Sequence, residues 1–170
     1  MFHIERDIRG FRVAVEGEEG TQRFGKALGS ALQAGDIIGL VGDLGAGKTT
    51  LTRSIALGAN VPEGTPVNSP TFTIMNLYRG QDLQLCHLDF YRLESAEELE
   101  GLGLEDLMGT DTAFIVEWWE RFDSALSDDI LRIDIEHTGE TSRRFVCRST
   151  GEGSLELLEE LAAALEVQIG

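Results

Sequence analysis

One stretch of the chain has the residues and the spacing of a phosphate-binding loop. Residues 42–49 read Gly-Asp-Leu-Gly-Ala-Gly-Lys-Thr, a complete G-x-x-x-x-G-K-[ST] pattern. In such a loop, backbone N–H groups surround the phosphates of a nucleotide, the lysine reaches the β- and γ-phosphates, and the hydroxyl binds Mg²⁺. Lysine is rare in this chain, since Lys26 and Lys48 are its only two. The pattern predicts nucleotide binding by Gly42, Asp43, Leu44, Gly45, Ala46, Gly47, Lys48, Thr49 and Thr50.

The segments on either side of the loop fit a strand and a helix. Residues 36–41 are mostly apolar, which is typical of a short strand buried on both faces. Residues 50–57 have a helical pattern and are followed by Gly58, a common helix stop. A helix that begins directly after the loop adds the positive end of its dipole to the phosphate site.

An acidic residue ends a second apolar run. Asp89 closes the stretch Leu83-Gln84-Leu85-Cys86-His87-Leu88-Asp89, in which Leu85, His87 and Asp89 share one face of a strand while Leu88 and Phe90 take the other. A bound triphosphate requires a divalent cation. We therefore predict that Asp89 fills the Walker B role near Mg²⁺. The alternative is a solvated aspartate at the end of a strand.

Glu117 ends a third apolar run, Thr112-Ala113-Phe114-Ile115-Val116. In α/β sheets, catalytic acids are commonly found at the ends of buried strands. We expect Glu117 to complete the magnesium shell beside Thr49 and Asp89 or to orient the attacking water. Glu120 is expected to be an exposed turn residue.

Three further features have both a functional and a structural interpretation. The stretch Ser69-Pro70-Thr71-Phe72-Thr73 lies where many phosphate-loop enzymes have a mobile segment that senses the γ-phosphate, although it also fits a hydroxyl-rich turn. Arg92 could neutralise developing charge or lie on the surface. Of Trp118 and Trp119, one could stack on a purine while the other packs in the core, and residue type alone favours the core for each.

The remaining pattern predicts an α/β protein with a mixed sheet. Short connections indicate two antiparallel hairpins, 71–79 with 83–90 and 130–136 with 143–148. The other expected elements are a strand at 11–16, a helix capped by Thr21 and running to about Leu32, a strand at 113–118, short helical segments between 95 and 107, and a helix at 155–167. We predict a three-layer P-loop NTPase-like fold with a mixed parallel and antiparallel sheet, in a single domain spanning 1–170.

Composition narrows the range of partners. With 14 Lys and Arg against 30 Asp and Glu, the net charge is −16, which argues against direct contact with a nucleic-acid backbone or an anionic membrane. Cys86 and Cys147 are too few for a disulfide framework and are expected to be reduced. The chain lacks a signal-like N-terminus and any run of about 20 apolar residues, so we expect a cytoplasmic protein.

Four stretches follow one another in the order seen in the TsaE family. They are the loop at residues 42–50, Ser69-Pro70-Thr71-Phe72-Thr73, His87-Leu88-Asp89-Phe90-Tyr91-Arg92-Leu93, and Glu117-Trp118. The chain thus resembles TsaE, a small bacterial ATPase of the tRNA threonylcarbamoyladenosine (t6A) pathway, over about residues 20–122. The family usually has proline after the Glu-Trp pair, whereas Trp119 stands there in this chain. No motif covers the part after about Asp123.

The resemblance implies a Mg²⁺-dependent ATPase that is weak alone and acts with the TsaB–TsaD transferase pair. ATP hydrolysis would reset or release that complex between turnovers, and tRNA would be held by the partners. The family pattern assigns Lys48 to the phosphates and Thr49 to the metal. It assigns Asp89 and Glu117 to acidic positions near the metal, Thr71 to a switch-like segment, and Trp118 to a possible adenine contact.

Other functions share the same loop. A small-molecule kinase is the main alternative, but it needs an arginine-bearing lid, and Arg92 is the only arginine between Asp89 and Glu117. A GTP-dependent switch usually needs an N-K-x-D element, which the chain lacks. Residues Asp106-Leu107-Met108-Gly109 do match the D-x-x-G pattern of such switches, but they lie in a helical region and do not directly follow a buried strand. An ATP-binding scaffold without turnover stays open, because binding and hydrolysis use nearly the same residues.

Overall fold

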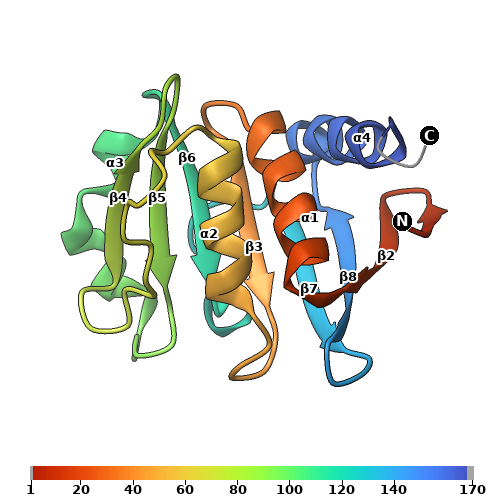
Figure 1. Cartoon of the computed structure of the whole chain (residues 1–170). Coiled ribbons are helices and arrows are strands. Elements are labelled where there is room, and N and C mark those ends of the chain that lie inside the picture. The colour runs from red at the N-terminus through yellow and green to blue at the C-terminus, as the bar shows by residue number, and fades with distance from the viewer. Residues whose placement is uncertain (1, 168–170) are drawn as a thin grey trace.

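Eight strands form one mixed sheet in the order β1-β2-β8-β7-β3-β6-β5-β4 in the computed structural model, which describes residues 2–167 (Figure 1). The strands are β1 (Ile4–Asp7), β2 (Gly10–Glu16), β3 (Ile37–Val41), β4 (Met75–Arg79), β5 (Gln84–Asp89), β6 (Thr112–Glu117), β7 (Leu131–His137) and β8 (Ser142–Ser149). The helical segments are α1 (Gly17–Ala31), α2 (Lys48–Gly58), η1 (Ala96–Leu102), α3 (Leu104–Leu107), η2 (Trp119–Phe122) and α4 (Glu152–Val167). Within residues 2–167, no helix has the length and apolar character needed to cross a bilayer.

The centre of the sheet is parallel and its two sides are antiparallel. Strand β3 pairs in parallel with both β6 and β7, and β6 pairs in parallel with β5. The outer pairs β1–β2, β2–β8, β7–β8 and β4–β5 are antiparallel. Because parallel strands end at the same edge, the loop after β3 and the last residues of β5 and β6 come together there. The predicted mixed sheet is thereby confirmed.

Helices cover the two faces of the sheet unequally. Long helices α1, α2 and α4 pack on one face over a large apolar cluster that includes Phe24, Ile55 and Leu161 (Figure 1). A smaller cluster on the other face is covered by the short segments η1, α3 and η2. Leu85 belongs to the first cluster and Leu88 to the second, so the alternation predicted for β5 is confirmed.

Several element boundaries differ from the sequence prediction. Helix α1 begins at Gly17, which leaves Thr21 inside the helix, where its Oγ1 donates to the Gly17 carbonyl rather than capping. The first predicted hairpin strand is shorter, because residues 71–74 form a turn and β4 begins only at Met75. Strand β6 ends at Glu117, one residue earlier than predicted, because Trp118 takes a left-handed conformation with φ 60°. Strand β1 was not predicted at all.

The two cysteines agree with the prediction of reduced thiols. Both side chains are buried and neither forms a disulfide. Burial raises the pKa of Cys86 to about 12, so this thiol stays protonated and unreactive.

A tryptophan fills the space that a glycine leaves in the central strand. Trp119 is 3 % exposed and stacks near Phe90, with ring centroids 6.2 Å apart. A Cβ atom on Gly39 would lie 2.7 Å from Cγ of Trp119, closer than two carbon atoms can approach. Trp119, which stands where the TsaE resemblance leads us to expect proline, is therefore a core residue packed against β3.

We expect this pair to be energetically coupled. Trp119→Ala removes a large buried ring and should lower the free energy of unfolding by about 3–5 kcal/mol. Gly39→Ala should cost about 1–3 kcal/mol through overpacking, and clearly less when Trp119 is already alanine. Urea unfolding of the two single variants and the double variant measures the coupling, with Leu77→Ala on the exposed side of β4 as the control. Strictly additive effects would contradict the packing described.

Candidate functional site

The phosphate loop connects β3 to α2 in a conformation that depends on its glycines. Gly45 and Gly47 have φ angles of 80° and 107°, in the left-handed region that favours glycine. Gly47 is the N-cap of α2, and its carbonyl accepts from the Leu51 N–H at 2.9 Å. The helix therefore begins at Lys48, two residues earlier than predicted, and its first N–H groups open toward the loop.

Lys48 lies folded over the loop. Its side chain is buried, and Nζ donates to the carbonyl oxygens of Gly42 at 2.5 Å and Asp43 at 2.9 Å. The ring of Trp118 covers Nζ, with the centroid 4.0 Å away, which is within the range of a cation–π contact. These contacts fix the ammonium group at one end of the loop.

The charge environment of Lys48 combines two opposing effects. Burial lowers the pKa of Lys48 from its ordinary value, while Glu117, Glu120, Asp89 and Asp43 act in the other direction. Partial desolvation therefore outweighs the attraction of the surrounding carboxylates.

Glu117 is held between a threonine and a histidine. It is 2 % exposed at the end of β6, directly beside Asp89 on β5 and Leu40 on β3. The Thr49 Oγ1 donates to Glu117 Oε1 at 2.9 Å, and His87 Nε2 lies 2.5 Å from Glu117 Oε2. Glu117 thus contacts the predicted metal-binding hydroxyl of the loop directly.

Asp89 is held by the segment that the sequence predicts to be switch-like. The hydroxyls of Ser69 and Thr71 both donate to Asp89 Oδ2, the latter at 3.2 Å. The backbone N–H of Tyr91 donates to the other oxygen, Oδ1, at 2.8 Å. Asp89 is 2 % exposed, so these donors replace the water that a carboxylate requires.

Two residues near the site have backbone conformations that residues other than glycine rarely adopt. Trp118 has φ 60° directly after Glu117, and Ile74 has φ 69° at the end of the 69–74 segment. For a β-branched residue such as isoleucine this region is strained. The Ile74 carbonyl accepts from the Asp89 N–H at 3.0 Å, so the strain lies next to the acidic residue.

These groups line one cavity of about 380 Å³ at the carboxyl edge of the parallel strands. Its lining comprises Leu44, Gly45, Gly47, Lys48, Thr49, Thr50, Ser69, Thr71, Asp89, Tyr91, Glu117 and Trp118. It contains the predicted catalytic and metal residues. Gly42 and Asp43 contribute carbonyl oxygens to Lys48 instead, and Ala46 lines the neighbouring cavity.

The oxygen atoms of this cavity suit magnesium, which prefers hydroxyl and carboxylate ligands. Across residues 2–167, no cluster of three His, Cys, Asp or Glu side chains could hold a metal by itself. A donor set of Thr49, Asp89 and Glu117 instead fits a cation that also uses phosphate oxygens and water.

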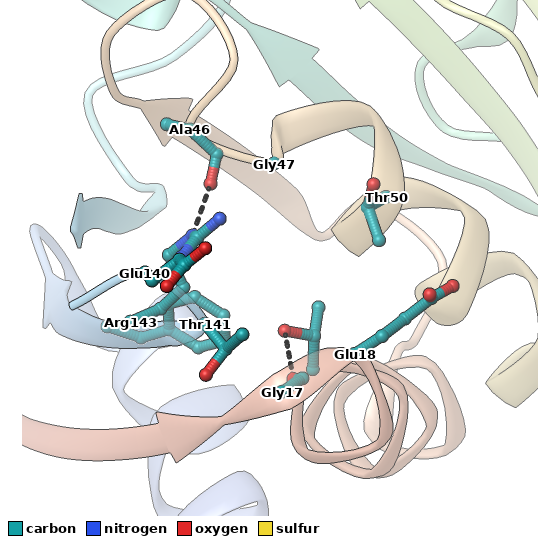
Figure 2. A pocket seen from close by; sticks show the side chains of 10 residues that line it. Gly17, Glu18, Ala46, Gly47, Thr50, Glu140, Thr141 and Arg143 are labelled. Carbon is teal, nitrogen blue, oxygen red and sulfur yellow. Dashed lines mark hydrogen bonds between the residues drawn. The ribbon is translucent and has the colours of Figure 1, made fainter. Parts of the chain in front are cut away.

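A second cavity of about 300 Å³ lies on the other side of the loop. Figure 2 shows Glu18 and Thr50 facing it from α1 and α2, and Arg143 facing it from β8. Arg143 Nε donates to the Ala46 carbonyl at 3.2 Å, which links the β7–β8 hairpin to the phosphate loop (Figure 2). The hairpin also contributes Glu140 and Thr141.

Some side chains around the site escaped the sequence analysis. Tyr78 and Arg143 belong to no motif. Tyr91 and His87 were noted only as members of the stretch 87–93 and, for His87, for the face of β5 that it shares. Arg92 does not line the cavity, because its guanidinium lies 4.3 Å over the exposed ring of Phe72. The polar residue His87 inside an apolar run was the one available signal, since a buried histidine needs hydrogen-bonding partners.

The sheet order, the loop between β3 and α2, and the carboxylates beside it define an α/β protein of the phosphate-loop nucleotide-binding class. Residues 15–145 match the sequence model of the family described as threonylcarbamoyl adenosine biosynthesis protein TsaE. The chain belongs to the TsaE family, which confirms the resemblance seen in the sequence.

Individual relatives agree with this assignment. The tRNA threonylcarbamoyladenosine biosynthesis protein TsaE of Bacillus subtilis is 37 % identical over 144 residues, 85 % of this chain and 89 % of that protein. The protein of the same name from Streptomyces coelicolor is 40 % identical over 125 residues, 71 % of this chain and 82 % of that protein. The crystal structure of Bacillus subtilis YdiB superposes with a TM-score of 0.77 at 29 % identity, covering 94 % of this chain and 98 % of that one.

We expect Lys48 to titrate at a lower pH in the folded protein than in concentrated urea. Because the folded-state pKa is lowered, the charged form opposes folding, and the free energy of unfolding rises as the pH is raised through that pKa. NMR of protein labelled with ¹³C at lysine Cε measures this directly, because Lys26 and Lys48 give the only two signals and Lys26 is exposed.

Glu117→Gln should lower the pKa of Lys48 further, because it removes the carboxylate that raises this pKa most. Glu105→Gln, on the exposed side of α3, is the matched control. An unchanged Lys48 titration in Glu117→Gln would contradict the electrostatic coupling.

Proposed function

We propose that the protein is a Mg²⁺-dependent ATPase that acts with a TsaB–TsaD-like transferase complex in t6A biosynthesis, and that hydrolysis resets or releases this complex between turnovers. One observation carries the ATPase part: Lys48, the Thr49 hydroxyl and the carboxylates of Asp89 and Glu117 line the same cavity beside the phosphate loop. The pathway part rests on membership of the TsaE family.

Each side chain has a separate task in this proposal. Lys48 and the N–H groups at the start of α2 bind the phosphates and offset the charge that develops on them. Thr49, Asp89 and Glu117 would hold Mg²⁺, which neutralises phosphate charge and orients the terminal phosphate. Glu117 contacts the loop hydroxyl directly, which supports the metal role over its alternative role of orienting the attacking water.

The segment 69–74 connects the proposed metal site to the surface of the protein. Ser69 and Thr71 both donate to Oδ2 of Asp89, and Asp89 lines the cavity. A change in what Asp89 binds therefore changes what holds this segment in place. Thr71 acts here through Asp89, which supports the switch-like role proposed for it.

The two cavities favour one orientation of ATP. The lysine of a phosphate loop reaches the β- and γ-phosphates, so the terminal phosphate lies in the cavity that contains Lys48 and Trp118. The nucleoside then extends past Thr50 into the cavity that Figure 2 shows, toward Glu18 and Thr141. This orientation places Trp118 beside the terminal phosphate, so an adenine contact by Trp118 is the competing arrangement.

The surface charge supports indirect contact with tRNA. The net charge of −16 disfavours binding to a phosphate backbone, so we propose that the partners hold the tRNA. We further propose that residues 1–170 act as one ATPase domain in the cytoplasm. Arg92, the arginine considered for a kinase lid, lies over Phe72 and outside the cavity that contains Lys48, which favours the ATPase over the kinase alternative.

Removing either carboxylate should separate binding from hydrolysis. We expect Asp89→Asn and Glu117→Gln to lower Mg²⁺-dependent ATP hydrolysis on the order of 100-fold, because each amide keeps the shape but loses the charge next to the metal. ADP affinity should change far less. The measurement is ATPase activity with and without co-purified TsaB and TsaD proteins, alongside a nucleotide-binding titration.

Glu105→Gln serves as the control, since this exposed carboxylate lies outside the cavity. Normal hydrolysis by both site variants in the presence of the partners would overturn the assignment of these residues. If the wild-type chain neither binds the partners nor is stimulated by them, the proposed function is overturned and the small-molecule kinase alternative is favoured.

The orientation of ATP can be tested by filling the second cavity. Thr141→Trp should weaken ATP and ADP binding about tenfold or more but leave inorganic tripolyphosphate binding unchanged, because tripolyphosphate has no nucleoside. Thr141→Val, which lacks the hydroxyl but keeps the size, should bind all three ligands normally. If Trp118→Ala, rather than Thr141→Trp, weakens ADP without affecting tripolyphosphate, then adenine stacks on Trp118.

A further inference from the structure

His87 is a fully buried histidine with a specific partner at each ring nitrogen. It is 0 % exposed in the middle of β5, two residues before Asp89 and on the same face of the strand. Its Nε2 contacts Glu117 Oε2 at 2.5 Å, and its Nδ1 lies 3.1 Å from the hydroxyl oxygen of Tyr78 on β4. The ring therefore connects the edge strand β4 to the site carboxylate on β6.

The chemistry of the partner fixes the direction of the hydrogen bond to Glu117. A carboxylate oxygen only accepts, so His87 Nε2 carries the hydrogen and donates to Glu117. The Tyr78 hydroxyl accepts from Asn76 Nδ2 at 3.3 Å and lies within hydrogen-bond distance of both His87 Nδ1, at 3.1 Å, and the Asn68 carbonyl oxygen, at 3.4 Å. Burial raises the pKa of Tyr78, which keeps this hydroxyl protonated and able to donate.

The other end of the chain of hydrogen bonds is the phosphate loop. Glu117 uses Oε2 for His87 and Oε1 for the Thr49 hydroxyl, so both carboxylate oxygens are engaged. With His87 in place, a rotation of the carboxylate that turns Oε1 away from Thr49 would break the bond to Nε2. Throughout residues 2–167, no buried side-chain polar atom lacks a partner, so a group left unpaired here would be an exception.

We propose that His87 is a positioning residue, held by Tyr78, that fixes the Glu117 carboxylate so that Oε1 faces Thr49 and the metal position. The inference deepens the proposed ATPase function and rests on it. A structural role alone would change stability and leave the turnover of the folded protein unchanged. A positioning role also changes the turnover number and the Mg²⁺ requirement, since partners behind metal ligands typically contribute about 10- to 100-fold.

Three variants separate these roles. His87→Leu removes the donor to Glu117, His87→Gln places an amide N–H near the position of Nε2, and Tyr78→Phe removes only the hydroxyl behind the ring. For each folded variant, kcat, the Mg²⁺ concentration for half-maximal activity and ADP affinity are measured with the TsaB and TsaD partners present. Urea unfolding of each variant reports stability separately.

We expect His87→Leu to lower kcat about 10- to 100-fold and to raise the Mg²⁺ requirement, with ADP affinity within about threefold of wild type. His87→Gln should recover most of the lost turnover, and Tyr78→Phe should cause a smaller loss of about two- to fivefold. Wild-type kcat and Mg²⁺ requirement in folded His87→Leu would overturn the proposal.

A spectroscopic measurement tests the same contact without using hydrolysis. In protein labelled with ¹⁵N-histidine, His87 should give a slowly exchanging, low-field Nε2–H signal, because His3 and His137 are exposed. The signal should disappear in His87→Gln and shift in both Glu117→Gln and Tyr78→Phe. It should also shift in wild type when Mg²⁺ and ADP are added together, but not with ADP alone.

The two measurements distinguish failure of the inference from failure of the proposed function. An Nε2–H signal that responds to Mg²⁺ with ADP in a protein that never hydrolyses ATP supports His87 as a positioning residue and overturns the ATPase proposal. A signal that is absent, or indifferent to Glu117→Gln, in a protein that does hydrolyse ATP overturns the role of His87 alone.

Discussion

The parallel pairing of β6 between β3 and β5 is the constraint on which the site depends. It sets Glu117 level with Leu40 just before the phosphate loop and level with Asp89 on the other side. A slip of one residue in either pairing would turn Glu117 to the opposite face of the sheet, away from Thr49. The apolar clusters on both faces of these strands make such a slip costly, so core packing and the geometry of the site are secured by the same contacts.

This arrangement brings charged groups into a poorly hydrated edge of the sheet. Lys48, Asp89 and Glu117 are each 5 % exposed or less, and each is surrounded by donors or acceptors from the protein itself. Carbonyl oxygens face the ammonium group, while hydroxyls, a backbone N–H and an imidazole face the carboxylates. The left-handed backbones of Trp118 and Ile74 lie beside these groups, which is where proteins commonly retain strain.

The sequence was sufficient to predict those parts of the site that lie at the ends of buried strands. The loop at 42–49, Asp89 and Glu117 could be placed because parallel strands end at one edge. The start of α1 was missed because Thr21 is a good capping residue, whereas the helix begins four residues earlier without any side-chain cap. The second cavity could not be foreseen, since residues near 17 and 141 meet only through the pairing of β2 with β8. Tyr78 and His87 likewise meet only through the register of β4 against β5.

The contact between Gly39 and Trp119 has a consequence for exchanging segments between relatives. The two residues come from β3 and η2, with the phosphate loop, α2, β4, β5 and β6 between them in the sequence. A chimaera joined anywhere in that interval, and completed with a relative that has proline after its Glu-Trp pair, would keep the glycine but lose the ring that fills the space above it. Functional comparison by segment exchange therefore has to move β3 and η2 together.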